Sequence, residues 1–430
     1  MAITDIKVYA HLTDTDVDLL GAEFDALRRE IEEDRGARDA RYIRRAIAAQ
    51  RALEISGRAL LLVAGRRRAL RYAGIATLSL AKIVENMELG HNISHGQWDW
   101  MNDPEIHSAT WEWDMTATSA HWKHAHNYSH HVHTNIVGMD DDVGFGILRL
   151  TRDEPWTPKH LFQPAANVLL AASFEWGIAL HDLKLTKRHL GVPRFEIASG
   201  PHREFARKAG RQLLKDYVLF PALSGRAWRK TLSANTIANV VRNVWAYLVI
   251  FCGHFPDGAE KFTARDLAGE TRGEWYLRQL LGSANISGGP VLHFLTGNLS
   301  HQIEHHLFPD LPSNRYAEIA VRVREICDRY DLPYTTGSLG RQYFSAFRTI
   351  HKLALPDHWL RRTVHDAPET SSERRFADSR WSGTEITTAP AGSGGYVGLR
   401  TALRTARKRR VTVVDERLVR TAGSDASAFR

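Results

Sequence analysis

The sequence predicts an all-α protein, and three observations support this prediction. Apolar residues recur at alternating steps of three and four, which is the period of an amphipathic helix. Several longer apolar segments are long enough for helical hairpins but are broken by single charges. Histidines occur in pairs four positions apart, and this spacing places two side chains on one face of a helix. The 430 residues fit one large helical unit with tails, or two to three ordinary domains.

The N-terminal region predicts two amphipathic helices. The first follows His11 and buries its apolar residues at helical spacing, behind possible capping residues at 13–16. The apolar positions of this helix are Val17, Leu20, Phe24, Leu27 and Ile31. A second helix, rich in Ala and Arg, is expected over residues 38–56. We expect residues 1–56 to form a cytosolic hairpin that packs on the rest of the chain.

The central region contains apolar but interrupted segments. Residues 57–90 are expected to form a hairpin that turns near 66–68, and residues 213–224 and 231–255 a second one. Residues 161–181 are interrupted by Glu175. The mean hydropathy is −0.34 and no clean apolar block of ~18 residues exists, so hydropathy alone favours a soluble helical protein.

The C-terminal third begins with a loop. Residues 279–303 are uncharged after Arg278 and rich in Gly, Asn and Ser, which indicates a loop that leads into a short helix. Residues 312–331 begin with proline and capping residues and predict a helix. From about 364 the composition is polar and then basic, and we expect a largely disordered tail suited to anionic lipid head groups.

Charge and cysteine content exclude some classes. Lys and Arg total 57 against 49 acidic residues, a net charge of +8 that an ordinary solvated surface explains, and we expect no nucleic-acid partner. Only Cys252 and Cys327 are present, which excludes a disulfide framework and a thiolate metal cluster. The first residues show no basic head followed by an apolar core, so we expect no secretory signal.

Histidines are concentrated in three short stretches, which we call boxes one, two and three. Box one is GHNISHG, with His91 and His95. Box two is HNYSHHVH, with His126, His130 and His131. Box three lies in GNLSHQIEHHLFPDLPS, with His301, Gln302, His305 and His306.

The spacing within the boxes predicts metal binding. On a helix His301 would face His305, and Gln302 would face His306, so either pairing could supply a ligand at the front of box three. Adjacent histidines diverge by about 100° and can serve two metal ions. Eight or nine imidazoles exceed what one tetrahedral zinc needs and match a two-metal site, but iron, zinc and copper all accept imidazole.

Other residues are weaker candidates. His254, at the end of an apolar segment, is either a further ligand or an interfacial histidine. His121, His124 and His133 flank box two and have less support. Ligating imidazoles usually donate their second N–H to an acceptor, and the carboxylates available near the boxes are Glu85, Glu88, Glu304 and Asp140 to Asp142.

The three boxes together, in this order and followed by Leu-Phe-Pro, resemble those of the membrane fatty acid desaturases. The resemblance covers residues 60–335, and GQWDWMNDPEIHS, FCGHFPDGAEKFT and LPSNRY are similar to actinobacterial acyl-CoA desaturases of the stearoyl-CoA Δ9 type. It implies an integral membrane protein with about four transmembrane helices, formed by 57–89, 161–183 and 213–255, and a cytosolic helical cap. The implied desaturase domain spans 57–335, before an extension at 336–363 and the tail at 364–430.

The resemblance also implies the chemistry. Two Fe ions with O2 as co-substrate would insert a cis double bond into a long-chain fatty acyl-CoA or a lipid-bound acyl chain, at an active site facing the cytoplasm. Its ligands would be the box residues, with His254 as an additional histidine. The sequence has no His-Pro-Gly-Gly haem motif, so electrons from NADPH would arrive through a separate NAD(P)H-dependent oxidoreductase or ferredoxin.

One residue departs from the Δ9 pattern and leaves the regiochemistry open. Gln302 stands at the front of box three, where glutamine is typical of Δ5 and Δ6 front-end desaturases. Two further alternatives remain: a di-iron lipid hydroxylase, and a non-catalytic membrane protein that stores or senses a metal. Product analysis and metal content distinguish these possibilities.

Overall fold

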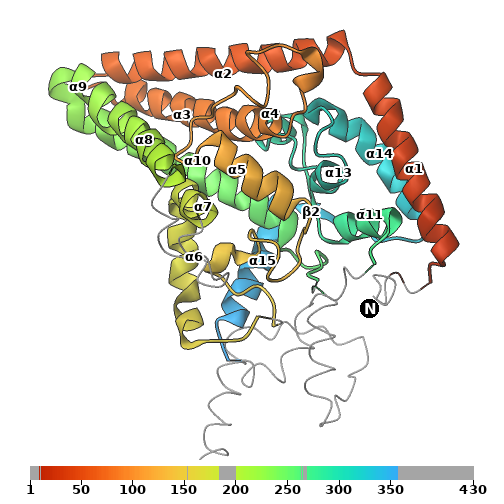
Figure 1. Ribbon diagram of the computed structural model, residues 1–430. Coiled ribbons are helices and arrows are strands. Elements are labelled where there is room, and N and C mark those ends of the chain that lie inside the picture. The colour runs from red at the N-terminus through yellow and green to blue at the C-terminus, as the bar shows by residue number, and fades with distance from the viewer. Residues whose placement is uncertain are drawn as a thin grey trace, which may run out of the picture.

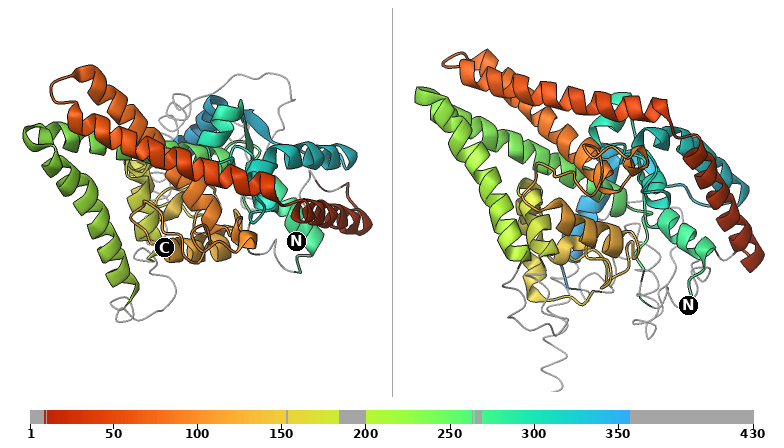
Figure 2. Two further views of the ribbon diagram at one scale, coloured as in Figure 1. Left: turned by 90° about the horizontal axis from the view of Figure 1, so that it is seen from above. Right: turned by 45° about the horizontal axis from the view of Figure 1, so that its top comes forward.

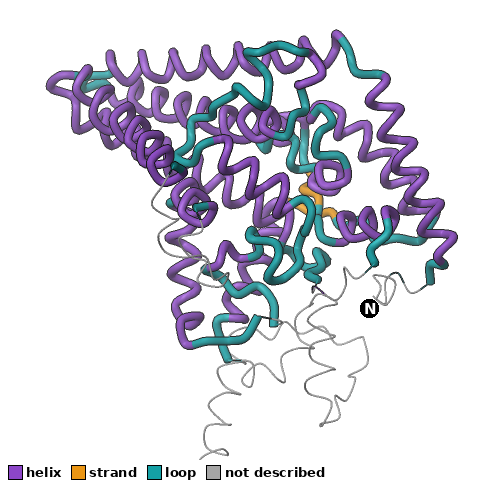
Figure 3. Tube along the Cα trace, viewed as in Figure 1, coloured by secondary structure: helices purple, strands orange, loops and turns teal. Residues whose placement is uncertain are grey.

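The computed structural model describes residue 9 and residues 11–152, 154–183, 200–262, 264 and 269–356. Helices dominate these residues, and the two strands are short (Figures 1 and 3). The all-α prediction is therefore confirmed. The predicted tail at 364–430 and the end of the predicted extension at 336–363 lie outside the described residues.

The longer helices are distributed along the whole described chain. In order they are α1 (Asp14–Glu33), α2 (Ala37–Val63), α3 (Arg68–Val84), α6 (Gln163–Ala172), α7 (Phe174–Asp182), α8 (Pro201–Leu213), α10 (Trp228–His254), α11 (Arg272–Leu281), α14 (Tyr316–Arg329) and α15 (Leu339–Leu353). Shorter α-helices are α4 (Asn92–Ser94), α5 (Ser119–Lys123), α9 (Phe220–Leu223), α12 (Pro290–Leu295) and α13 (Gln302–Leu307). Within the described part of the chain, three segments are π-helical, namely η2 (Glu85–His91), η4 (His124–His130) and η8 (Leu214–Leu219).

Helix α1 begins and packs as the sequence predicts. The Thr13 side chain accepts a hydrogen bond from the Asp16 N–H, and the Asp16 carboxylate accepts one from the Thr13 N–H. The apolar stripe of α1 packs against α11 and α14. The expected α1–α2 hairpin is not formed, because α2 runs on at an angle and pairs with α3 (Figure 1).

Two helical hairpins extend from the centre of the molecule. The first is α2 with α3, which turns at residues 64–67, and the second is α8 to α9 with α10. The sequence predicts a hairpin at both places and turns close to the observed ones, but the first arms are longer than predicted: α2 begins at Ala37 rather than near 57, and α8 begins at Pro201 rather than near 213. Helix α3 packs along α10, and the tips of the two hairpins lie together at one end of the molecule (Figure 2).

Buried charges are paired between the hairpins. The Asp216 carboxylate accepts hydrogen bonds from Arg58 at 2.7 Å and from Lys82 at 2.9 Å. The Lys82 ammonium also binds Asp114 at 2.9 Å, and Arg242 is ion-paired with Glu175. Buried charges are tolerated when they are paired and hydrogen-bonded, as these are.

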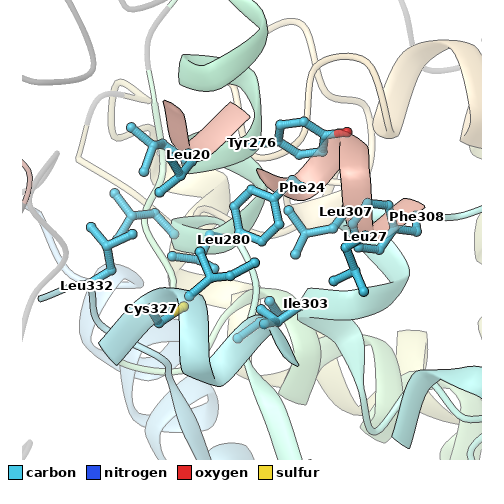
Figure 4. Close-up of a cluster of buried hydrophobic side chains, with 14 of the residues drawn as sticks. Leu20, Phe24, Leu27, Tyr276, Leu280, Ile303, Leu307, Phe308, Cys327 and Leu332 are labelled. Carbon is cyan, nitrogen blue, oxygen red and sulfur yellow. The ribbon is translucent and has the colours of Figure 1, made fainter. Parts of the chain in front are cut away.

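A second region packs under α1 and carries box three. Leu20, Phe24 and Leu27 of α1 meet Tyr276 and Leu280 of α11 (Figure 4). From α13, Ile303 and Leu307 point into the same cluster. Because this face of the short helix is held in an apolar core, the opposite face has a fixed orientation.

The strand pair fixes the start of α13. Strands β1 (Asn285–Ser287) and β2 (Thr336–Ser338) are parallel, with Asn285 opposite Thr336. The Asn285 side-chain oxygen accepts a hydrogen bond from the Ile303 N–H at 2.9 Å. The predicted loop at 279–303 thus contains a strand and a short helix, α12, before box three.

Hydropathy singles out one helix among the described residues. Residues Gly225–His254 are long and apolar enough to cross a membrane, with a mean hydropathy of 1.3 over the best window, although a buried helix of a soluble protein passes the same criterion. Apolar side chains are nevertheless exposed along both hairpins and α6. Among them are Val63, Tyr72, Val168, Leu169, Leu214, Val218, Leu223, Trp228, Val240 and Val241.

Candidate metal centre

Box one lies at the end of the first hairpin. His91 is the last residue of the π-helical segment η2, and His95 follows the single turn of α4. Their rings lie 4.7 Å apart, centroid to centroid. The spacing predicted an ordinary α-helix; the chain is instead π-helical as it reaches the box, a geometry found mostly at functional sites.

Box two is also π-helical. Segment η4 carries His126 and His130, both buried, and His131 follows directly. The ring of His126 stacks on Trp122, one turn earlier, with 4.3 Å between centroids. The exposed side of this segment carries Tyr128 and Val132, so the box forms an outer wall of the centre.

Box three and the end of α10 complete the walls. His305 and His306 of α13 are fully buried. His254 ends α10, and its Nε2 lies 3.0 Å from Nε2 of Gln302 and 3.2 Å from Nε2 of His306. A β-carbon on Gly253 would lie 2.8 Å from the Gln302 side chain, so glycine is required for this close approach.

The donor atoms form two adjacent groups. His91, His95, His126 and His305 each offer a nitrogen within 4.8 Å of the others, and His130, His131 and His306 do the same. His126 and His130, one from each group, also come within this distance of an oxygen of Asp142. His254 adjoins the second group through His306 and His130. His91 and His305 approach to 3.2 Å between their Nε2 atoms.

His301 lies apart from both groups. Its ring stacks on His293 at 4.6 Å, and its Nδ1 faces Glu304 at 3.9 Å. His301 is the N-cap of α13, with φ −101° and ψ 58°, so it is outside the helix on which the four-residue spacing was based. Gln302, the first helical residue, is the one that meets His254.

Supporting groups hold several rings by Nδ1. Asp140 contacts His130 at 2.9 Å, and Asp142 contacts His126 at 3.3 Å. His305 is held by the Tyr316 hydroxyl at 3.2 Å, and His306 by the Gln279 side-chain oxygen at 3.1 Å. The sequence offers Asp140 to Asp142 as candidates, whereas it does not identify Gln279 or Tyr316, although Tyr316 ends the motif LPSNRY.

The other expected acceptors have different partners. Glu88 accepts hydrogen bonds from Tyr42, Asn298 and Ser313. Glu304 accepts them from Asn285 and Tyr334. These carboxylates therefore brace the segments around the centre. His121, His124 and His133 lie outside the two groups of donor atoms.

Burial keeps most of these imidazoles neutral. It lowers the pKa of His91 to about 3 and holds the pKa values of His95, His126, His131, His305 and His306 well below the usual range. His130 differs: burial opposes its charge, but the carboxylates of Asp140 and Asp142 outweigh that effect and raise its pKa. Neutral imidazoles have the lone pair that a metal ion needs.

The unpartnered atoms fit a metal centre. Buried nitrogens without a hydrogen-bond partner include Nε2 of His95, His126 and His130 and both ring nitrogens of His131, together with Oε1 of Gln302. Such atoms are costly to bury unless something binds them. Their gathering at one place, with Nδ1 of His126 and His130 held from behind, fits metal ions between the boxes.

A cavity reaches the centre from the side of the hairpins. The empty space between its walls is about 540 Å³, part of which is open to solvent, and His91 and His126 line it at the end next to the centre. Apart from Asn86 and Asp142, the remaining walls are apolar or aromatic, and they include Trp113, Trp122, Phe145 and Phe174. A long apolar ligand fits such a cavity better than a polar one.

Comparisons with known proteins show that this chain is similar to fatty acid desaturases. The family model described as fatty acid desaturase matches residues 70–338. The chain is 60% identical over 414 residues, 95% of its length and 96% of the relative's, to the NADPH-dependent stearoyl-CoA 9-desaturase of Mycobacterium tuberculosis. It is 24% identical to the sn-1 linoleoyl-lipid 6-desaturase of Synechocystis sp., over 62% of this chain and 75% of that one. Identity to the acyl-lipid (8-3)-desaturase of Mortierella alpina is 23%, over 59% and 57%.

Proposed function

The chain belongs to the fatty acid desaturase family, and we propose that it introduces a cis double bond at the Δ9 position of a saturated long-chain acyl-CoA. The observation that carries this proposal is the 60% identity, over nearly the full length of both chains, to an enzyme named for that reaction on stearoyl-CoA. Oxidoreductase activity follows from the family, while the position of the double bond and the thioester substrate are part of the proposal.

We propose that two iron ions occupy the centre. One would be held by His91, His95, His126 and His305, and the other by His130, His131, His254, His306 and Gln302. The bound iron pair would supply redox chemistry with O2, which the removal of two hydrogens from unactivated carbons requires, whereas zinc has no redox chemistry. The ring orientations set by Asp140, Asp142, Tyr316 and Gln279 support this arrangement.

The residues of the chain position the substrate. The apolar cavity would take the saturated part of the acyl group, and Trp113, Trp122 and Phe145 would exclude water along it. Because the inner end of the cavity is formed by His91 and His126, an acyl chain that enters it passes beside the first group of imidazoles. A carbon held there is oriented before reaction, which is a large part of catalysis.

Electrons would come from a separate protein. The Mycobacterium tuberculosis relative is named as NADPH-dependent, and this chain has no His-Pro-Gly-Gly motif for a fused haem domain. We propose an NAD(P)H-dependent oxidoreductase or a ferredoxin as the donor. Box two is the wall on which such a partner could approach the centre, because Tyr128 and Val132 on its outer side are exposed.

We propose that the protein is integral to the cell membrane with its centre at the cytoplasmic side. The exposed apolar side chains of the two hairpins and α6 would face lipid, since large exposed apolar patches mark interaction or membrane surfaces. The expected spans at 57–89, 161–183 and 213–255 would then correspond to the end of α2 with α3, to α6 with α7, and to α9 with α10. Helices α1, α11, α13 and α14 would form the cytosolic cap. Charges inside the hairpins are paired with one another, as in membrane interiors.

A front-end desaturase is the second candidate. Gln302 is directed into the centre, and glutamine at this position is typical of Δ5 and Δ6 enzymes. The Synechocystis relative is named as a 6-desaturase of linoleoyl lipid. The position of the new double bond distinguishes this candidate from a Δ9 enzyme.

Product analysis tests the proposal. Expressed in membranes with a reducing partner and saturated C16 and C18 substrates, the protein should yield cis-Δ9 acids, detected by gas chromatography. His305→Ala should abolish the product and lower the iron content, whereas His351→Ala, on α15 outside the centre, should change neither. A Δ5 or Δ6 product would favour the front-end candidate, and a hydroxylated product would identify a hydroxylase. No product, with variable zinc or copper in place of iron, would contradict the proposal.

A further inference from the structure

The far end of the apolar cavity meets a set of paired charges, which we call the charged layer: Lys82, Asp114, Glu175 and Arg242. Lys82 Nζ binds the Asp114 carboxylate at 2.9 Å. Arg242 donates to the backbone oxygen of Asp114 at 2.8 Å and is ion-paired with Glu175. Lys82 and Arg242 are almost completely buried.

One face of α10 leads from the metal centre to this layer. His254, Ile250, Ala246 and Arg242 follow at intervals of four residues and therefore lie on one stripe of the helix. Ile250 and Ala246 line the cavity. At a rise of 1.5 Å per residue, Arg242 lies about 18 Å along the axis from His254.

Along the first hairpin the same features follow in the same order: metal ligand, cavity wall and charged layer. His91 and Asn86 line the cavity, and Lys82 is one helical turn beyond Asn86. Helices α3 and α10 pack along each other and both run toward the centre, so Lys82 and Arg242 meet at the same depth through Asp114.

Two further segments place a charge directly behind the cavity wall. Trp113 and Met115 line the cavity, while Asp114 between them binds Lys82. Phe174 lines it, while the next residue, Glu175, binds Arg242. Asp114 and Glu175 therefore directly follow residues of the wall, and Lys82 and Arg242 lie one helical turn beyond the wall residues Asn86 and Ala246.

We propose that the charged layer is the end stop of the acyl-binding cavity and sets the longest acyl chain that the enzyme accepts. This inference rests on the proposed function. An apolar chain gains burial with each methylene until its methyl end reaches the layer. Further methylenes would have to separate buried ion pairs, and a charge left without its partner in such a place is strongly unfavourable.

Two variants test the end stop from opposite sides. Glu175→Leu with Arg242→Leu removes both members of one pair and leaves no new unpaired charge, because Asp114 keeps Lys82 and Lys215. Ala246→Leu fills the cavity one turn before the layer. Val241→Leu, on the exposed side of α10, is the matched control.

Binding is measured first, without a reductant, as the rise in the thermal unfolding midpoint caused by saturated acyl-CoAs of C12 to C24. For the wild-type protein the rise should grow with chain length and then fall sharply. This break should move to chains longer by two carbons or more in the double variant, move to shorter ones in Ala246→Leu, and stay in Val241→Leu. An unchanged break in a folded Ala246→Leu protein, or in a folded double variant, would overturn the proposal.

Competition between substrates gives the second measurement. The ratio of C20 to C18 product should rise about tenfold in the double variant, and the ratio of C18 to C16 product should fall about tenfold in Ala246→Leu, with the double-bond position unchanged. If acyl-CoAs show the length break but no double bond is made, the proposed function fails alone. If Δ9 products form and the variants leave both ratios unchanged, the end stop fails alone.

Discussion

At the scale of single residues, the orientation of the imidazoles depends on residues outside the boxes. Asp140 is fully enclosed, holds Nδ1 of His130 and also accepts hydrogen bonds from the N–H groups of Asn135 and Asp142. These two backbone hydrogen bonds fix the orientation of the Asp140 carboxylate, and the carboxylate in turn orients the ring of His130. This leaves Nε2 of His130 directed away from Asp140 and toward the other imidazoles.

We expect Asp140→Asn to weaken metal binding about 10- to 100-fold, because an amide holds the ring of His130 less firmly and with no charge. Iron per chain, measured after dialysis against a chelator series, checks this. Asp18→Asn on the exposed side of α1 is the control and should retain iron as the wild type does. Equal iron retention by both variants would show that Asp140 has no such role.

Substitutions of Gln302 and of His301 should have clearly different effects on iron content. Gln302→Ala removes a side chain 3.0 Å from His254, so we expect loss of iron from the second group and of most activity. His301→Ala removes a ring that stacks on His293, and we expect iron content close to that of the wild type. Elemental analysis of the two proteins is sufficient, and the reverse result would place the ligand at His301.

The sequence alone does not decide whether His301 or Gln302 is the ligand at the front of box three, and the reason is physical. Spacing arguments assume that all the residues compared lie on one helix. Box three satisfies this only from Gln302 onward, because His301 has a non-helical backbone conformation. The start of a helix depends on tertiary contacts, here the bond from Ile303 to Asn285, which no local pattern reveals.

At the scale of elements, the helices were predictable and their local geometry was not. The spacing of Val17 to Ile31 and the Thr13 cap identified α1, and the hairpin turns were placed within a few residues. The π-helical form of η2 and η4 was not predictable, because a segment of seven residues is too short to show an apolar period that differs from that of an α-helix. The clustering of the histidines nevertheless followed from their number and order.

The contact between α10 and α13 depends on one missing side chain. We expect Gly253→Ala to displace Gln302, since the added β-carbon would lie 2.8 Å from it, and so to lower iron content and activity severalfold or more. Gly210→Ala on α8 is a matched control: a β-carbon there meets nothing within 4 Å, and alanine favours the helix by about 1 kcal/mol. Iron content and the thermal unfolding midpoint of both proteins are measured together. A Gly253→Ala protein with normal iron would contradict this account.

At the scale of the whole molecule, one arginine joins the N-terminal helices to the cap. Arg315 is buried and donates to both carboxylate oxygens of Asp39, at 2.6 and 2.8 Å, and to Asp34 at 2.7 Å. These acids lie at the junction of α1 and α2, while Arg315 directly precedes α14 as its N-cap residue. The hydrogen bonds therefore hold the angle between α1 and α2.

We expect Arg315→Ala to destabilise the protein by about 3–5 kcal/mol, because it leaves the carboxylate of Asp39 buried without its partner. Arg322→Ala removes an exposed ion pair with Glu30 and should cost less than about 1 kcal/mol. The thermal unfolding midpoints of the two variants in detergent should differ clearly. Similar midpoints would show that Arg315 does not brace the junction.

Whole-molecule features were the hardest to predict from local sequence. Hydropathy favoured a soluble protein, because Lys82, Glu175 and Arg242 each interrupt one of the apolar segments. The structure pairs these charges inside the hairpins and leaves apolar side chains outside. A window average cannot separate the two faces of a helix, whereas the fold does so directly.

The distribution of the donor atoms along the chain has a consequence for biosynthesis. Each of the two groups needs a histidine of box three, His305 in one and His306 in the other. While the chain is being translated, neither group can be completed until residue 306 has left the ribosome and α13 has packed beneath α1. For the proposed iron pair, complete loading of both groups is therefore a late event that reports finished folding, although His126, His130 and Asp142 already lie within 4.8 Å of one another without box three.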